Sequence, residues 1–343
     1  MEFIKPDVNI DFIGKRKIAY FLSGSLILLT LILLVIKGPR YGVDFTGGVL
    51  IQVRFNTRKT IDEIRAALKP IHLDDSIIQQ FSGVSEYLIR VRKTNIDLAG
   101  IHDKVKDALI KKFGKGVDIR RVEMVGPKIG KELKQKALLA IFYSLLFIAI
   151  YISGRFEMKW AMSMIMAMTL AIVVYTASSF GAKVSWLIFI AMIITLGLCW
   201  FLKLRYALGA IIALIHDVTI TVGAFLITQK EISLAIVAAL LTIVGYSLND
   251  TIIVFDRIRE NLKKSKKQSF PVLINRSINE TLSRTILTSS TTLVVVVALF
   301  LLGGKVIHDF AFAMLVGIVV GTYSSIYVAS PILLIWEEEF GKT

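Results

Sequence analysis

Long apolar stretches separated by short polar connections dominate the hydropathy pattern of the chain. A helix needs about 20 mostly apolar residues to cross the hydrocarbon core of a bilayer. Stretches of about that length predict eight membrane-spanning helices, at residues 18–36, 137–154, 160–182, 184–202, 206–229, 232–255, 285–304 and 310–335. We therefore expect a mainly α-helical polytopic membrane protein with eight transmembrane helices.

Between the first two stretches, residues 37–136 follow a different pattern. Strand-like runs predict β-strands at residues 49–55, 77–81, 87–93 and 117–125. The alternation of the last run breaks at Arg120-Arg121, and Gly83 lies in the turn between the middle two runs.

Two amphipathic helices are predicted between these strands. The first begins at a capping box formed by Thr60 and Glu63 and stops at Pro70. The second has apolar positions at helical spacing from Leu98 and ends at Gly114. The resulting order βαββαβ is that of a ferredoxin-like domain. Because the segment shows no nucleophile with a base and no phosphate-binding loop, we expect a binding or docking module and not an enzyme.

Composition and charge fix the orientation of the predicted helices. The chain is 55% hydrophobic, and residues 37–136 hold 21 of its 41 Lys and Arg residues. The short connections on the side of the termini carry 17 Lys and Arg residues, whereas the opposite turns carry three. By the positive-inside rule, residues 1–17 and the tail 337–343 are expected in the cytoplasm, and residues 37–136 in the periplasm.

Seven of the other 20 basic residues lie in the predicted cytoplasmic loop 256–283. Six of them fall between 257 and 267, and the loop also carries apolar residues, a composition typical of amphipathic helices lying on anionic lipids. This topology accounts for most of the net charge of +15, so nucleic-acid binding is not expected. The single Cys199 excludes a disulfide framework and a multi-cysteine metal site, and no cofactor is expected.

Few ionisable groups lie inside the predicted membrane helices, and such groups usually pair with one another or serve transport. The helix at 206–229 contains His216 and Asp217, the helix at 232–255 contains Asn249 and Asp250, and Arg284 stands at the start of the next. For Asp217, local satisfaction by His216 or by a nearby hydroxyl is an equally good interpretation.

The spacing of polar residues predicts a polar track between two antiparallel helices. Thr242, Tyr246, Asn249 and Asp250 recur at intervals of three and four, and on the next helix Thr281, Arg284, Thr288 and Thr291 do the same. Burial favours the neutral form of a carboxylic acid, and a nearby guanidinium favours the charged form. We therefore expect Asp250 and Arg284 to form a proton relay, supported by Asn249, Tyr246, Asp217 and His216. A static ion pair between Asp250 and Arg284 is the alternative.

Four motifs stand out in the sequence: GVDFTGG at 42–48, VGP at 125–127, ALIHD at 213–217 and GYSLNDTIIVFDRIREN at 245–261. Together with residues 284–293 and 321–330, they resemble motifs of the SecD/SecF family of protein-export membrane proteins, within the resistance-nodulation-division superfamily. From the sequence alone, glycines and a capping side chain would make the GVDFTGG tract a tight turn. The resemblance covers nearly the whole chain.

The resemblance implies an accessory subunit of the Sec translocase in the bacterial inner membrane. Such a subunit pairs with SecD, works beside the SecYEG channel and uses the proton-motive force to release translocating preproteins. YajC and YidC are further candidate partners. By the motif, Asp250 and Arg284 correspond to functional residues of the family. A stand-alone proton- or sodium-coupled antiporter and a non-transporting assembly scaffold remain as alternatives.

One departure from the family pattern is clear. The family passes directly from an RFE motif, here residues 155–157, to the helix that bears the HD pair, which gives six membrane helices. In this chain about 46 additional residues separate the two motifs. We expect them to form an added hairpin at the periphery of the bundle.

Overall fold

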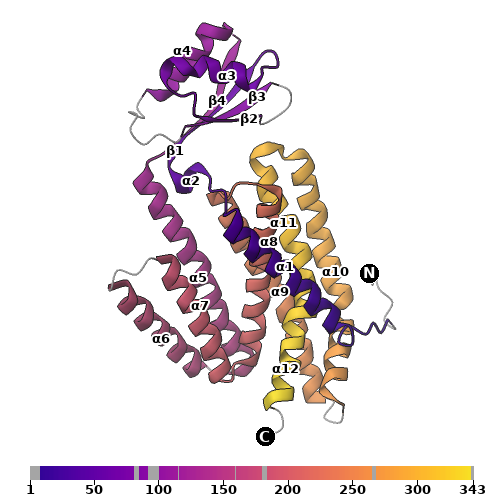
Figure 1. The fold of residues 1–343 in the computed structure, drawn as a ribbon. Coiled ribbons are helices and arrows are strands. Elements are labelled where there is room, and N and C mark those ends of the chain that lie inside the picture. The colour runs from indigo at the N-terminus through magenta and orange to yellow at the C-terminus, as the bar shows by residue number, and fades with distance from the viewer. Residues whose placement is uncertain are drawn as a thin grey trace. The chain divides into compact units, whose positions relative to one another are not determined.

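The computed structural model describes residues 8–80, 85–91, 100–114, 116–158, 160–179, 184–264 and 268–340. The chain divides into two compact units (Figure 1). A helical unit comprises residues 1–40, 138–230 and 235–343. The second unit comprises residues 41–137 and 231–234 and is called the outward unit after the orientation expected from the sequence. The predicted turn at Gly83, the start of the second amphipathic helix at Leu98, and the ends of the predicted terminal segments lie outside the described residues.

Long apolar helices build the helical unit. They are α1 (Arg16–Ile36), α5 (Pro127–Glu157), α6 (Trp160–Ser179), α7 (Val184–Phe201), α8 (Arg205–Thr228), α9 (Leu234–Lys264), α10 (Phe270–Leu302), α11 (Gly304–Ser324) and α12 (Ser330–Phe340). Among the described residues, six helical stretches are long and apolar enough to cross a membrane, with α11 to α12 counted as one. Helices α6 and α7 form the additional hairpin, and their described apolar portions, 160–170 and 189–201, are shorter.

A π-helical turn, η2 (Ser325–Ala329), joins α11 to α12. Proline has no N–H group to donate and its ring collides with the preceding turn, so Pro331 is incompatible with a regular helix at this point. The wider π-helical turn accommodates the proline, and the hydroxyl of Ser330 donates to the carbonyl of Ser325 at 2.8 Å.

The segment 256–283 differs from its prediction. Instead of separate helices on a lipid surface, α9 continues to Lys264 and α10 already begins at Phe270. Apolar residues of the two extensions are buried, among them Ile258, Leu273, Ile274 and Ile278. Asn261 donates to Ser277 at 3.0 Å and to Glu280 at 2.8 Å. These four buried side chains are therefore not available to lipid, whereas Val272 remains exposed.

The outward unit contains a four-stranded antiparallel sheet of order β2-β3-β1-β4. Its elements are α2 (Val43–Thr46), β1 (Gly48–Phe55), α3 (Ile61–Leu68), a 3-10 turn η1 (Lys69–Ile71), β2 (Ile77–Gln80), β3 (Glu86–Val91), α4 (Ile101–Phe113) and β4 (Val117–Val125). The predicted element order is therefore present. The core lies between the sheet and α3 and α4, and includes Val49, Ile51, Val53, Ile64, Leu68, Ile89, Val105 and Leu109.

Local signals in the sequence of this unit have direct structural counterparts. Thr60 and Glu63 form the expected capping box, and hydrogen bonds from Thr60 hold the pKa of Glu63 below its usual value. The irregular pair Arg120-Arg121 marks a β-bulge, since Gln52 faces Arg121 whereas Val53 faces Ile119.

The glycines that precede β1 adopt conformations that other residues avoid. Gly47 has φ +70° and ψ 167°, a region populated almost only by glycine. A Cβ atom at Gly47 would lie 2.8 Å from the Cα atom of Pro127, which is backbone and has little freedom to move. Backbone conformation and steric exclusion of a side chain therefore both favour glycine at position 47 of the GVDFTGG tract.

We predict that Gly47→Ala destabilises the protein much more than Gly38→Ala. Gly38 also has a positive φ, +66°, but a Cβ atom there meets nothing within 4 Å. Strain alone should cost about 1 kcal/mol at Gly38, whereas the backbone collision adds to it at Gly47. Thermal unfolding of the purified variants measures the difference, and equal melting temperatures would contradict the collision.

Candidate functional site

Asp250 is the most deeply placed acidic group of α9. It is 1% exposed, and its Oδ2 atom accepts a hydrogen bond from Ser289 of α10 at 3.2 Å. Ser289 also lies 2.7 Å from the hydroxyl of Thr322 on α11. Among the described residues, nothing hydrogen-bonds to Asp250 Oδ1 or to the buried Thr285 hydroxyl. The carboxyl group is therefore only half satisfied, which is costly away from water.

Arg284 does not pair with Asp250 in the described part of the chain. Its side chain is exposed, and it lines a cavity of about 670 Å³ formed by α5, α9 and α10. Asn249 and Thr281 line the same cavity. Nearby charges are already paired, because Arg155 bonds Asp256 at 2.7 Å and Arg257 bonds Glu280 at 2.6 Å. The static ion pair of Asp250 and Arg284, which was the alternative to a relay, is thus absent from the described residues.

The inward-facing hydroxyl groups of α10 differ from the predicted set. Residues Thr281, Thr285 and Ser289 are buried at a spacing of four, whereas Thr291 is exposed together with Arg284. Both sets satisfy helical spacing, so spacing alone could not choose between the two adjacent stripes. The apolar residues Ile278 and Leu282 are buried on the inward side of α10. Their positions in the sequence were the signal that could have identified the inward face.

On α9, the predicted polar face turns mostly away from the rest of this chain. Thr242 and Asn249 are exposed, while Tyr246 is partly buried and donates to the carbonyl of Thr288 at 3.0 Å. Of the residues predicted on this face, only Asp250 points inward. The structure therefore brings Asp250 close to α10 and α11 and leaves Asn249 beside Arg284 at the cavity.

His216 and Asp217 of α8 lie at the centre of a saturated polar network. Asp217 accepts hydrogen bonds from Ser247 of α9 at 2.5 Å and from Ser324 of α11 at 2.8 Å, and contacts His216 Nδ1 at 2.8 Å. The other ring nitrogen of His216 lies 3.1 Å from Ser23 of α1. Local satisfaction of Asp217, left open by the sequence, is confirmed by these contacts.

The two acidic centres share a pair of helices. Helix α9 contributes Ser247 to the first centre and Asp250 to the second, while α11 contributes Ser324 and Thr322. Displacement of α9 against α8 and α10 would therefore change the hydrogen bonds of both carboxyl groups together.

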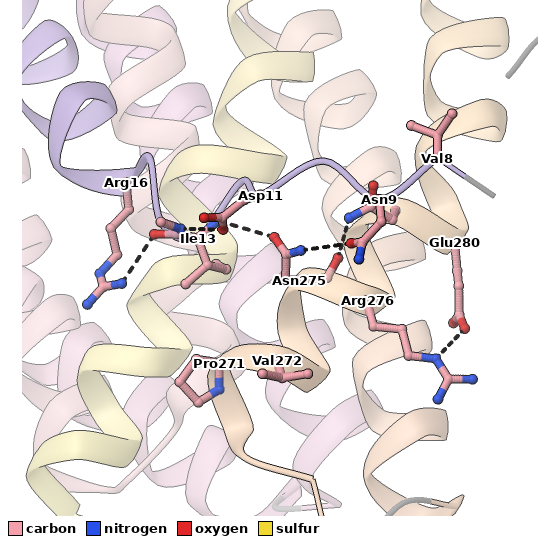
Figure 2. A pocket seen from close by; sticks show the side chains of 12 residues that line it. Val8, Asn9, Asp11, Ile13, Arg16, Pro271, Val272, Asn275, Arg276 and Glu280 are labelled. Atoms are coloured by element: carbon pink, nitrogen blue, oxygen red, sulfur yellow. Dashed lines mark hydrogen bonds and ion pairs between the residues drawn. The ribbon is translucent and has the colours of Figure 1, made fainter. Parts of the chain in front are cut away.

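A second cavity, of about 740 Å³, lies between the segment before α1 and the start of α10 (Figure 2). Two asparagines of α10 bind backbone N–H groups of that segment. Asn275 accepts a hydrogen bond from Phe12 N–H at 2.8 Å, and Asn279 accepts one from Ile10 N–H at 2.8 Å. Charged residues of both signs, including Asp11 and Arg276, line the cavity. The sequence did not predict these contacts between α10 and the segment before α1, because an asparagine that binds a distant backbone group leaves no local pattern.

Comparison with known proteins defines the family. The family model described as protein export membrane protein SecD/SecF, C-terminal, matches residues 105–199 and 176–339, and the SecD/SecF GG motif matches residues 32–57. A protein translocase subunit SecF from Magnetococcus marinus is 44% identical over 341 residues, which cover 98% of this chain and 95% of that protein. The chain belongs to the SecF family of protein translocase subunits.

Further relatives agree with this assignment. A SecF subunit from Vibrio alginolyticus is 40% identical over 97% of this chain and 91% of its own length. The crystal structure of SecDF from Thermus thermophilus, described as a translocon-associated membrane protein, superposes with a TM-score of 0.76 at 32% identity. That match covers 98% of this SecF-family chain but 40% of the SecDF chain. The C-terminal family model is matched in two stretches, which meet in the region of α7.

We predict that Asp217→Leu destabilises the bundle more than Asp217→Asn. Asparagine retains an acceptor for the hydroxyl groups of Ser247 and Ser324, whereas leucine leaves both without a partner. Each buried unsatisfied group costs roughly 1–3 kcal/mol. The melting temperature of the purified protein in detergent reports the ranking, and a leucine variant as stable as the asparagine variant would show that the network contributes nothing.

Proposed function

We propose that this chain is the SecF half of a SecD–SecF unit that couples proton entry to the late steps of preprotein export. The family assignment supports the role of translocase subunit. The carboxyl group of Asp250, one oxygen of which has no hydrogen-bond partner among the described residues, is the proposed coupling site. A buried carboxyl with a free oxygen is able to hold a proton, and the exposed Arg284 is able to stabilise the charged form when it approaches. One charge that crosses the membrane gains about 2.3 kcal/mol per 100 mV, which is enough to bias a conformational equilibrium.

Within this proposal, protons leave Asp250 for the cytoplasm along α10. The cavity lined by Arg284 is also lined by Thr281, and Thr285 and Ser289 follow at one helical turn each. At 1.5 Å per residue, these hydroxyl groups are spaced about 6 Å apart along the helix, a gap that one water molecule bridges. Asn249, Tyr246, Asp217 and His216 support the relay by holding the positions of α8, α9 and α10.

SecD is the partner that the exposed surface of α10 fits. Large apolar side chains of α10 are exposed in this chain alone, including Val294, Val295, Leu301 and Leu302, as are those on much of α1. Arg284 and the polar residues of α9 lie exposed in this chain, so SecD would complete the site. The SecDF structures, of which this chain matches 40%, fit this view because they join both halves in one chain. Contacts with SecYEG, YajC, YidC, preprotein and anionic lipid belong to the same proposal.

The proposed topology follows from charge and helix length. Helices α6 and α7 would add two crossings to the six long helices and bring the total to eight, with both termini in the cytoplasm of a bacterial inner membrane. Residues 37–136 would lie in the periplasm as a ferredoxin-like domain, for which the strand order β2-β3-β1-β4 is the support. Mostly apolar side chains exposed on the hairpin, such as Met164, Met168 and Trp186, suit a lipid or partner contact at the periphery.

The decisive experiment is Asp250→Asn in cells that contain SecD and the SecYEG channel. We expect export stimulated by the proton-motive force to be lost, while the amount of protein and its co-purification with SecD stay unchanged. Asp62→Asn is the matched control, because Asp62 is exposed and pairs only with Arg65 of its own helix. Normal export in Asp250→Asn would refute the relay. Coupled ion flux by the purified chain in liposomes without SecD would favour the antiporter instead.

A second prediction tests the route along α10. Thr285→Val removes a buried hydroxyl without changing the shape of the side chain, and we expect export driven by the proton-motive force to slow several-fold. Thr285→Ser should retain the rate because it keeps the hydroxyl. Thr291→Val is the control, since Thr291 is exposed and bonds only carbonyls of its own helix. An unchanged rate in Thr285→Val would exclude this hydroxyl from the path.

A further inference from the structure

The connection between α8 and α9 is built into the outward unit. Residues 231–234 belong to that unit, although the helices on either side belong to the helical unit. Ile232 forms a parallel bridge with Tyr41, and its carbonyl accepts a hydrogen bond from Gly42 N–H at 2.9 Å. The first residues of the outward unit and this short connection are therefore joined backbone to backbone.

Asp44 of the GVDFTGG tract caps helix α9. Its Oδ2 atom accepts a hydrogen bond at 2.8 Å from the N–H of Leu234, the first residue of α9. The first N–H groups of a helix have no partner within the helix, and a negative charge beside them is favourable. A residue 190 positions away thus accepts the first N–H group of α9.

A buried ion pair anchors the same connection to the sheet. Arg90 of β3 is 7% exposed and pairs with Glu231. A buried guanidinium without a partner is strongly unfavourable, so Arg90 holds Glu231 in place. β3 lies inside the sheet, between β2 and β1, and the connection is consequently fixed both to the sheet and to the segment that leads into it.

We propose that residues 41–44, Arg90 and the connection 231–234 form a rigid linkage by which α9 moves the outward domain. This inference rests on the proposed function, because the movement would arise when Asp250 gains or loses a proton. Asp250 lies 16 residues after Leu234 within one unbroken helix, α9, or about 24 Å at 1.5 Å per residue. Displacement of α9 is delivered through Leu234 to Asp44 and through Glu231 to β3. Asp44 is a positioning residue in this scheme.

A disulfide bond across the linkage tests its rigidity. A Cβ atom on Gly42 would lie 3.5 Å from the Cβ atom of Ser233, which is within the range found in disulfides. We expect Gly42→Cys with Ser233→Cys, in a Cys199→Ala background, to form the bond and to keep full export stimulated by the proton-motive force. The single-cysteine variants are the controls. Failure to cross-link, or export that is lost on oxidation and restored by reduction, would overturn the proposal.

Uncoupling variants test the linkage from the other side. Asp44→Ala combined with Glu231→Gln should reduce export stimulated by the proton-motive force at least ten-fold while the proton flux that depends on Asp250 persists. Asp44→Asn retains an oxygen acceptor for Leu234 N–H and should rescue export when Glu231 is intact. Unchanged export in the double variant, or an equal loss of export and flux, would overturn the linkage. Asp250→Asn separates the two claims, because failure of the proposed function leaves flux and export intact in that variant.

Discussion

The structure depends on one constraint: a polar group inside the bundle, away from water, must find its hydrogen-bond partner within the chain itself. Two carboxyl groups meet this constraint differently. Asp217 is saturated by hydroxyl groups from two helices and by His216, whereas Asp250 has one partner, Ser289, and an oxygen that no described residue satisfies. A saturated group stabilises one arrangement of helices. A half-satisfied group lowers the cost of leaving that arrangement, and for this reason we assign coupling to Asp250 and support to Asp217.

Much of the fold could be predicted from local signals. The capping box at Thr60, the bulge at Arg120 and the helix end at Gly114 each depend on a few neighbouring residues, and all three are found where the sequence predicted them. Burial of Asp250 was also predictable, because a carboxylate in an apolar run has nowhere else to lie. The family motifs led to the same residue from an independent direction.

The missed features depend on partners distant in sequence or on a choice between adjacent faces. Spacing alone placed Arg284 on the inward track of α10, whereas Thr285 and Ser289 occupy the interior. Asn275 and Asn279 bind the backbone of the segment before α1, and an asparagine in a helix carries no sign of such a contact. The segment 256–283 was misread because a basic amphipathic pattern suits a lipid surface and a helical hairpin equally well.

The outward unit is discontinuous, and this affects the order in which the protein is made. Its sheet is complete once residue 125 has been synthesised, but Glu231 emerges from the ribosome only after residues 138–230. Until then, Arg90 has no acidic partner from that connection. Biogenesis is therefore sequential: the sheet is made first, and it gains its ion pair with Glu231 only after α8 has been made. If synthesis stopped before that point, the sheet would be folded but Arg90 would lack its ion pair with Glu231.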